Sequence, residues 1–387
     1  MKYLLLRLKR FCGFLTGLVF FISGILKLLD PVGTGLVMQE YFGFLHIGFM
    51  DFAAKALGTA LAFAEAITGT ALITGVWRKT TVITAIIFQG FFTLLTLLLV
   101  IFNPEMDCGC FGEAIHLTHT QTFIKNLILC ALLAAYCIPF KLLGKNLKHK
   151  FVSFAIVTTS VAAFTVYSWM YIPMVDFTDF KPASELQAGS HNHEDMYESV
   201  FIYEKDGKQE EFSLEDLPDS TWTFVSTETR TRKGHRNATT VNLSFYDEDG
   251  TYHDHLAAEG QVMVISVYDT SIRKSKWDRI ESFMKTASES GFRPILLVSS
   301  PDAPTESEYF VCDYKTLITM NRSNGGVTYF NNGYLISKWS FRAMPDKEEL
   351  LEIHEWDITE TIIDEDTKGS LGFQGFLLYV FAVMLLL

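Results

Sequence analysis

Six long apolar runs constrain this chain more than any other feature of its sequence. They are residues 11–29, 53–76, 81–102, 121–140, 151–173 and 371–387. A helix of about 20 apolar residues crosses the ~30 Å hydrocarbon core of a bilayer, so each run predicts a transmembrane helix. The first run is longer than the apolar part of a signal peptide and has no small-x-small cleavage site. We therefore expect it to stay in the membrane.

The charged residues divide the chain into two unlike parts. Residues 175–368 hold 37 of the 44 Asp and Glu residues but only 19 of the 32 Lys and Arg residues, so the remainder is net basic. This division predicts a membrane bundle, with the lipid bilayer as its surroundings, joined to an acidic aqueous domain. Because no basic footprint is present, we expect no nucleic-acid partner.

The placement of Lys and Arg predicts the orientation of the chain. These residues gather in the segments 2–10, 78–79 and 141–150, which six alternating spans put on one side of the membrane. The segments 30–52 and 103–120 are poor in both and would form loops on the other side. Cytoplasmic loops carry an excess of Lys and Arg. We therefore predict a protein of the bacterial cytoplasmic (inner) membrane with a cytoplasmic N-terminus and a periplasmic polar domain.

The spans and the polar segments predict six parts in order. We expect a four-helix membrane bundle (1–150), a fifth transmembrane helix (151–173), a linker (174–199), a periplasmic domain (200–356), an acidic linker (357–370) and a sixth transmembrane helix (371–387). Both linkers are turn-rich and lack apolar periodicity, which is typical of flexible tethers.

The pattern of the polar domain predicts an α/β fold. Two continuous apolar strands, 261–268 and 293–300, flank a helix over 274–290, and a hairpin over 326–339 turns at Asn332-Gly333. Strands that are apolar throughout are typical of a parallel sheet covered on both faces. The domain is therefore expected to have a parallel core with an antiparallel edge.

This order over residues 241–354 resembles the TlpA-like branch of the thioredoxin fold, including its Asp-x-Asp-Gly turn at 247–250. In that family a Cys-x-x-Cys pair follows the first core strand, where a helix N-terminus lowers a thiol pKa. Here residues 268–271 read Tyr-Asp-Thr-Ser, and Gly325-Gly326 stand where the family has a cis-proline. The resemblance therefore implies a redox-silent domain.

Cys108 and Cys110, in the stretch "NPEMDCGCFGE", are separated only by Gly109. A disulfide between residues i and i+2 needs a distorted backbone, which the glycine permits, and a strained disulfide is oxidising and labile. The pair is therefore a candidate redox site in an oxidising compartment. The alternatives are a static disulfide or two small residues that close a loop. Only His116 and His119 lie nearby, whereas structural zinc takes four ligands, so no metal is expected.

Glu65 falls near the middle of the second run, where a carboxylate costs a few kcal/mol unless it faces the bundle interior, is protonated or has a partner. It is a candidate to move protons during thiol oxidation or to bind a quinone head group. The alternative is a hydrogen bond to Gln89 or Thr93 of the third run. Lys27, near the end of the first run, is expected to snorkel to the interface.

The sequences "DCGCFGE" (107–113) and "AFAEAITGTALITG" (62–75) resemble the DoxX/MauE family of redox-associated membrane proteins. The segment "SNGGVTYFNNGYLISKWS" (323–340) is similar to the long Bacteroidota-type form, which adds a periplasmic domain. The resemblance implies a four-helix membrane protein associated with disulfide formation. It also implies that Cys108 and Cys110 are the redox pair and that Glu65 is the family's intramembrane carboxylate.

Two functions follow from these patterns. The first is thiol–disulfide exchange with exported periplasmic proteins through Cys108 and Cys110, with quinone as a candidate electron acceptor. The second is a non-catalytic membrane scaffold whose redox-silent domain binds a periplasmic or envelope partner, because a fold does not by itself fix a function.

Overall fold

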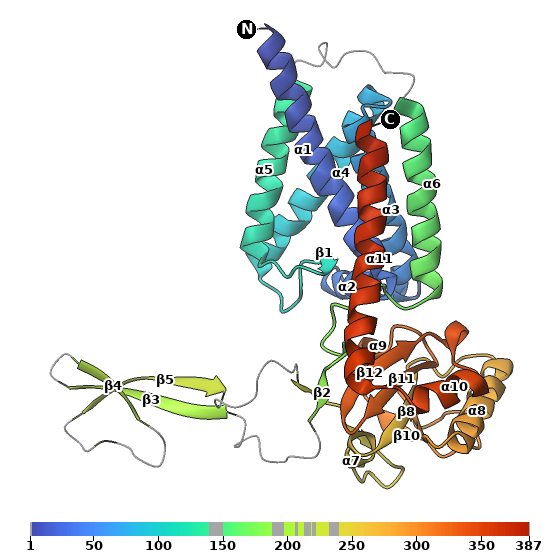
Figure 1. Ribbon diagram of the computed structural model, residues 1–387. Coiled ribbons are helices and arrows are strands. Elements are labelled where there is room, and N and C mark those ends of the chain that lie inside the picture. Colours follow the sequence, from blue (N-terminus) through green and yellow to red (C-terminus); the bar gives the residue numbers. More distant parts are fainter. Residues whose placement is uncertain are drawn as a thin grey trace.

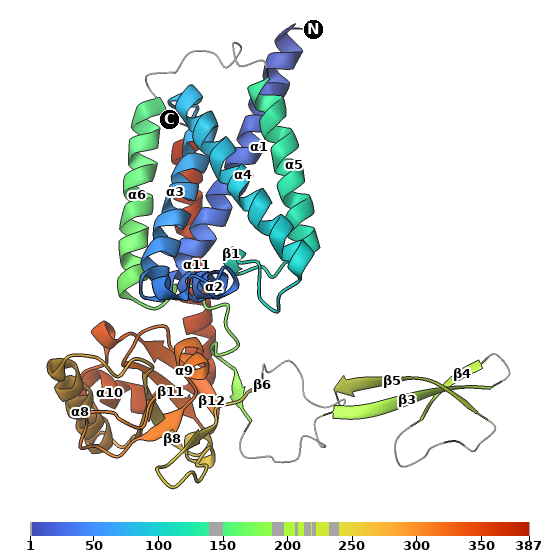
Figure 2. The same ribbon diagram turned by 180° about the vertical axis from the view of Figure 1, so that it is seen from behind.

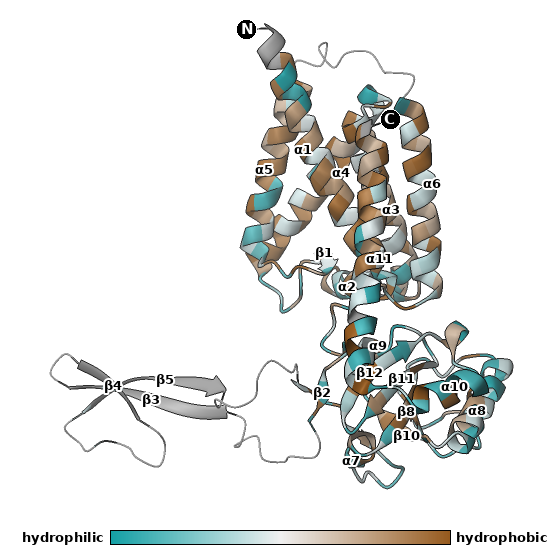
Figure 3. Cartoon of the chain, in the orientation of Figure 1, coloured by the Kyte–Doolittle hydropathy of each residue, from teal (hydrophilic) through white to brown (hydrophobic). Residues whose placement is uncertain are grey.

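The computed structural model describes residues 2–138, 150–187, 197–205, 208–212, 218, 222–231 and 240–386. Within this part of the chain, six helices are long and apolar enough to cross a membrane. They are α1 (Lys2–Leu29), α3 (Ala54–Thr74), α4 (Arg78–Phe102), α5 (His119–Cys137), α6 (Lys150–Met170) and α11 (Ile358–Leu386), and they form one bundle (Figure 1). The helices of the bundle are coloured mostly as hydrophobic residues, whereas the attached domain mixes hydrophilic and hydrophobic residues (Figure 3). The predicted membrane region with a separate α/β domain is confirmed.

Helix α11 corrects the prediction of a flexible acidic linker over 357–370. It begins at Ile358 and continues without a break through the acidic stretch to the other end of the bundle (Figure 1). The Asp357 carboxylate accepts a hydrogen bond from the Glu360 N–H at 3.0 Å, which caps the first turn. Gly369 lets the helix pass the backbone at Met174, because a Cβ there would lie 1.9 Å from the Met174 carbonyl oxygen.

The two ends of the bundle differ in charge and in what they carry. The start of α1, the turn between α3 and α4 and the start of α6 share one end (Figure 2), and these are the places of the predicted basic clusters. The segment 139–149, which holds part of the third cluster, lies outside the described residues. The opposite end carries the short strand β1 (Cys110–Glu113) and the α/β domain.

The predicted loop over 30–52 is instead largely helical. It contains α2 (Pro31–Phe44), which lies across the end of the bundle (Figure 1), and the 3-10 helix η1 (Gly48–Ala53). The Asp30 carboxylate accepts hydrogen bonds from the N–H groups of Val32 and Gly33 at 3.1 and 2.9 Å. A capping carboxylate followed by proline at the first helical position is a strong helix start.

Small residues bring α1 and α3 into close contact. A Cβ on Gly24 would lie 2.5 Å from the Ala66 nitrogen, and a Cβ on Gly69 would lie 2.4 Å from the Phe21 nitrogen. Such positions let the backbones of two transmembrane helices approach each other. Lys27, which follows Gly24 by about one turn, is thereby placed against Glu65 of α3.

The α/β domain is built on an eight-stranded sheet with the order β6-β2-β12-β11-β8-β9-β10-β7. Its strands are β2 (Glu185–Leu186), β6 (Thr240–Val241), β7 (Phe245–Tyr246), β8 (Gln261–Val267), β9 (Arg293–Val298), β10 (Phe310–Cys312), β11 (Gly326–Asn331) and β12 (Tyr334–Trp339). Strands β8, β9 and β10 are parallel, and the hairpin of β11 and β12 joins β8 in the antiparallel sense. The predicted parallel core with an antiparallel edge is confirmed.

Helices cover both faces of this sheet. Helices α8 (Lys274–Glu289) and α10 (Lys347–His354) pack on one face, and α7 (His255–Ala258) and α9 (Tyr314–Met320) pack on the other. In β8, Val262 and Val264 pack in the hydrophobic core beneath α7 and α9, whereas Met263 and Ile265 pack in the core beneath α8 and α10. Burial on both faces explains why this strand is apolar at nearly every position.

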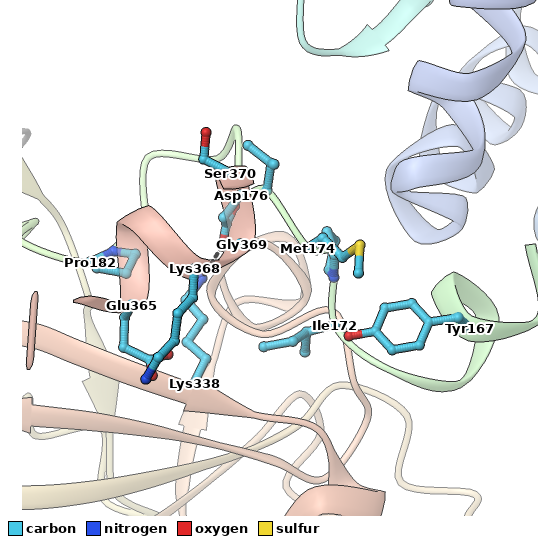
Figure 4. Close-up of a pocket in the computed structure, with 12 residues that line it drawn as sticks. Tyr167, Ile172, Met174, Asp176, Pro182, Lys338, Glu365, Lys368, Gly369 and Ser370 are labelled. Carbon is cyan, nitrogen blue, oxygen red and sulfur yellow. Dashed lines mark hydrogen bonds and ion pairs between the residues drawn. The ribbon is translucent and has the colours of Figure 1, made fainter. Parts of the chain in front are cut away.

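The predicted linker 174–199 is partly built into the domain. Strand β2 pairs with β12 and β6, so residues 185–186 belong to the sheet. The Asp176 carboxylate forms a 2.6 Å ion pair with Lys338, whose side chain is 7% exposed (Figure 4). Burial lowers the pKa of Lys338, while Asp176 opposes that shift. Residues 188–196 lie outside the described part of the chain.

A second sheet lies within the predicted domain 200–356. Strands β3 (Tyr197–Lys205), β4 (Lys208–Phe212) and β5 (Thr223–Thr231) form an antiparallel sheet with the order β4-β3-β5. It shares no strand with the eight-stranded sheet as described. The predicted domain therefore contains two separate sheets.

Candidate functional site

The loop that holds Cys108 and Cys110 connects α4 to α5 and is fixed by α1 and α2. The Tyr41 hydroxyl of α2 donates a hydrogen bond to the Cys108 carbonyl oxygen at 2.8 Å. The Ser23 hydroxyl of α1 donates one to the Cys110 carbonyl oxygen at 2.6 Å. Cys108 is buried and Cys110 is partly exposed.

Gly109 between the two cysteines is required by both conformation and space. Its φ is +57°, in the left-handed region that other residues adopt at a cost. A Cβ at this position would also lie 2.4 Å from Cγ1 of Val37 in α2. The close approach of the loop to α2 thus depends on the missing side chain.

Burial controls the protonation of Cys108. Burial raises the pKa of the Cys108 thiol, the Thr122 side chain lowers it, and Cys110 raises it further. Among more distant charges, Asp107 raises the pKa and Lys125 lowers it. At neutral pH the Cys108 sulfur is therefore held as the neutral thiol, and Cys110 is the more exposed of the two residues.

Glu65 forms a buried ion pair with Lys27, at 2.6 Å between Oε2 and Nζ. The side chains are 6% and 12% exposed, respectively. The alternative of a hydrogen bond to Gln89 or Thr93 is not what the structure shows. Lys27 donates to Glu65 instead, and the Gln89 amide donates to the Asn126 carbonyl at 3.0 Å and to the Thr93 hydroxyl at 3.3 Å. The expectation that Lys27 snorkels is also wrong: its ammonium turns into the bundle, where a charge needs a partner.

Lys27 and Cys110 both line two separate cavities. The smaller, of about 30 Å³, also borders Glu65, Gln89 and Asn126, and it has room for about one water. The larger, of about 300 Å³, also borders Cys108. Its other walls are largely apolar and include Val37, Met38, Leu61, Phe91, Phe92 and Leu95. Lys27 and Cys110 therefore border both cavities, whereas Glu65 borders only the smaller and Cys108 only the larger.

Arg322 connects the α/β domain to the cysteine loop. Its guanidinium forms ion pairs with Asp30 at 2.8 Å and with Glu113 at 3.1 Å, and its side chain is 5% exposed. Glu113 lies three residues after Cys110 in β1. Burial raises the pKa of Glu113, and Arg322 is the strongest influence that lowers it. Sequence reasoning missed these residues, although the Asp30-Pro31 pair was a usable helix-start signal.

The position after β8 holds no thiol. The Asp269 carboxylate accepts hydrogen bonds from the Ser271 N–H, at 3.0 Å, and from the Ser271 hydroxyl. Within the described residues of the domain, Cys312 is the only cysteine. It is buried in the core of the sheet, and burial raises its pKa to about 12. This thiol is therefore unsuited to exchange.

The remaining cysteines lie within the bundle. Cys12 and Cys137 pack in one apolar cluster near the end that is remote from the domain, and the Cys130 sulfur contacts the Thr93 hydroxyl at 3.4 Å. Across the described ranges, no group of three or more His, Cys, Asp or Glu side chains is placed to hold a metal ion.

Comparison with known proteins matches two segments of the chain. The family model for the methylamine utilisation protein MauE matches residues 2–139, and a domain of unknown function (DUF8463) matches residues 197–233. The first segment contains α1 to α5, and the second contains β3 to β5. Neither the curated proteins nor the solved structures contain a match. The chain is thus a multi-pass membrane protein whose helical part resembles MauE and carries a separate α/β domain.

Proposed function

We propose that this protein is a thiol–disulfide oxidoreductase of the bacterial inner membrane that forms disulfides in exported proteins. The electrons would pass from the Cys108–Cys110 pair to a membrane quinone. The observation that carries the proposal is the apolar cavity of about 300 Å³, which borders both cysteines and Lys27. The volume lies at the lower end of the range for small-molecule pockets.

In the proposed cycle the oxidised pair reacts first with an exported dithiol. A thiolate of the exported protein attacks Sγ of Cys110, the more exposed sulfur, and the Cys108–Cys110 bond breaks. Cys108 leaves and takes up a proton, as burial favours its neutral thiol. The second thiol of the exported protein then displaces Cys110. Two electrons and two protons are thereby transferred to the Cys108 and Cys110 thiols.

Reoxidation of the pair returns those two electrons and two protons to an acceptor. The largely apolar lining of the larger cavity fits a flat quinone ring, and the Lys27 ammonium at its edge fits a quinone oxygen. A quinone bound there would accept the electron pair and the protons. Lys27 also borders the smaller cavity beside Cys110, so it is placed to hand on a proton. Glu65 compensates its charge inside the bundle.

Several observations support the proposed topology. The described basic clusters lie at the end of the bundle remote from the α/β domain, as the excess of cytoplasmic Lys and Arg would require. The order β9-β8-β11-β12 is compatible with the thioredoxin-like, redox-silent domain inferred from sequence. Arg322 forms ion pairs with Glu113, which follows the cysteine loop, and with Asp30 at the start of α2. The domain would therefore guide exported proteins to the pair from the periplasm.

The test is capture of a mixed disulfide in intact membranes. Cys108→Ser leaves Cys110 as a single thiol, whose thiolate can attack a disulfide of an exported protein, the reverse of the last exchange step. Because Cys108 is then missing to displace Cys110, the mixed disulfide should accumulate and be visible on non-reducing gels. Cys110→Ser is the matched control and should accumulate far less. Normal disulfide formation by a variant in which both residues are Ser would contradict the proposal.

The alternative, a non-catalytic scaffold, is favoured by one specific observation. Arg322 fixes a domain without a cysteine pair onto the bundle through ion pairs with Asp30, which is buried, and Glu113, which is partly exposed. A scaffold would yield a stable envelope complex after mild solubilisation, and its cysteines would keep one redox state whatever thiol or quinone is added. Cycling of the pair would exclude this alternative.

A further inference from the structure

A cleft of about 780 Å³ lies at the junction between the bundle and the α/β domain. Its bundle wall comes from the start of α3 and the end of α6. Its domain wall comes from the start of α8, the segment 322–324 and the 3-10 helix η3 (Phe341–Ala343). Neither cysteine of the redox pair borders it. This cleft is therefore separate from the proposed redox site.

The cleft is lined by cationic side chains and by no Asp or Glu. The cations are Lys55, Arg273, Lys276, Arg279, Arg322 and Arg342. Arg322 is paired with Asp30 and Glu113, whereas none of the other five forms an ion pair with a described carboxylate. This arrangement stands out in a region of the chain where acidic residues outnumber basic ones about two to one. A cleft of one sign of charge concentrates ligands of the opposite sign.

Aromatic side chains hold three of these cations in place. Lys55 Nζ lies 4.5 Å from the centre of the Trp169 ring. Lys276 Nζ and the Arg279 guanidinium lie 4.5 and 4.9 Å from the centre of the Phe341 ring. The Lys276 ammonium also donates a hydrogen bond to the Asn324 carbonyl. Burial lowers the pKa of Lys276 and Arg342 lowers it further, whereas Asp269 raises it. A bound anion would favour the charged form.

The position of the cleft relates it to the membrane surface. Trp169 and Tyr171, at the end of α6, line it and are 42% and 38% exposed. Tryptophan and tyrosine gather where the hydrocarbon core meets the headgroups. An anion in this cleft would therefore lie at the depth of lipid phosphates. Cations from both parts of the molecule line the cleft, with Lys55 from the bundle and Lys276 and Arg342 from the domain.

We propose that this cleft binds the phosphate-bearing headgroup of an anionic phospholipid. The lipid would bridge the two parts of the molecule beside the Arg322 ion pairs. Its phosphate would be held by cations from both walls, and its acyl chains would lie along the end of α6. The proposal does not depend on the proposed redox function, because no residue of the cysteine loop takes part.

The test measures lipid retained by the full chain purified in neutral detergent. Native mass spectrometry would count bound phosphatidylglycerol, with phosphatidylcholine as the neutral comparison. Substitution of Lys276, Arg279 and Arg342 by Ala should weaken retention by roughly fivefold for each residue removed, as for basic groups at an anionic membrane surface. Substitution of Lys274, Lys285 and Lys347, exposed cations of the same domain that do not line the cleft, removes the same charge and should leave retention unchanged.

Two further measurements examine the role of charge and the identity of the anion. Replacement of Arg279 and Arg342 by Lys retains the charge and should restore most of the binding, which separates a binding defect from a folding defect. Inorganic phosphate at millimolar concentration tests a soluble anion as the ligand. Equal retention by the Ala variant and its control would overturn the proposal. Binding of phosphate without selective retention of phosphatidylglycerol would also overturn it.

Discussion

The α/β domain and the end of the bundle that it contacts differ in what their chemistry allows. After β8 the domain presents Asp269, Thr270 and Ser271, and its described thiol, Cys312, is buried in the sheet. The end of the bundle presents Cys108 and Cys110 beside an apolar cavity and a buried ion pair. Under the proposed function, the domain serves for contact through Arg322, and the reactive groups belong to the membrane part.

The largest effect should separate these two regions directly. Replacing both Cys108 and Cys110 by Ser should reduce disulfide formation in exported proteins to the uncatalysed level, because no other described thiol borders the cavity. The matched change in the domain, Cys312→Ser, should leave the rate unchanged. The measurement is the thiol content of exported proteins after pulse labelling. An equal loss of disulfide formation in both variants would contradict the assignment of the thiol chemistry to the bundle rather than to the domain.

The ion pair of Lys27 and Glu65 should matter next. Lys27→Met leaves Glu65 uncompensated inside the bundle and should destabilise the chain by about 3–5 kcal/mol. The double variant Lys27→Met with Glu65→Leu should recover most of this stability. Thermal unfolding in detergent measures both. Reoxidation of the cysteines by quinone should remain slow in the double variant. Reoxidation at the normal rate would show that the Lys27–Glu65 ion pair has only a structural role.

Arg322 tests whether contact with the domain matters for the cysteine loop. Arg322→Ala leaves Asp30 and Glu113 without their partner and should cost about 3 kcal/mol, the lower end for a broken buried pair, because Glu113 is 26% exposed. Alkylation at Cys110 should become faster as the loop loosens. Lys315→Ala is the control, since its contact with Glu40 is exposed and 4.0 Å long. An unchanged rate of Cys110 alkylation in Arg322→Ala would show that contact with the domain does not hold the cysteine loop in place.

Gly109 tests the geometry of the loop alone. Gly109→Ala adds a methyl group against Val37 at a left-handed position and should cost about 1–3 kcal/mol. Adding Val37→Ala should recover the part of this cost that is due to the steric clash. Unfolding of the two variants measures the difference. Identical stability of Gly109→Ala and the parent chain would show that the loop does not pack against α2.

The smallest effect concerns pH. Burial raises the pKa of Cys108, so its thiolate forms only above the range of an ordinary thiol near 8.5. Alkylation of Cys108 should therefore continue to rise with pH after an unfolded control has reached its plateau. Peptide-resolved mass spectrometry measures the rate at each pH. A plateau at the same pH in folded and unfolded chains would contradict the shift.

Local patterns in the sequence predicted much of the fold. The apolar runs placed six membrane helices, and the strands around 274–290 predicted the parallel core. The continuous α11 was missed because its acidic residues masked a capping pattern, Asp357 followed by Glu360. The partners of Glu65 and Arg322 were missed for another reason. Lys27 and Glu65 are 38 residues apart, and Asp30 and Arg322 are 292 residues apart. No periodicity encodes such pairs.

The most direct test of the central claim is the redox behaviour of Cys108 and Cys110 in native membranes. Mass tagging of the two thiols would follow them after addition of a reduced exported protein and then of quinone. The cysteine pair should be reduced by the exported protein and reoxidised by quinone, with a potential above about −300 mV, as for labile disulfides. A pair that stays in one state through both additions would contradict this expectation.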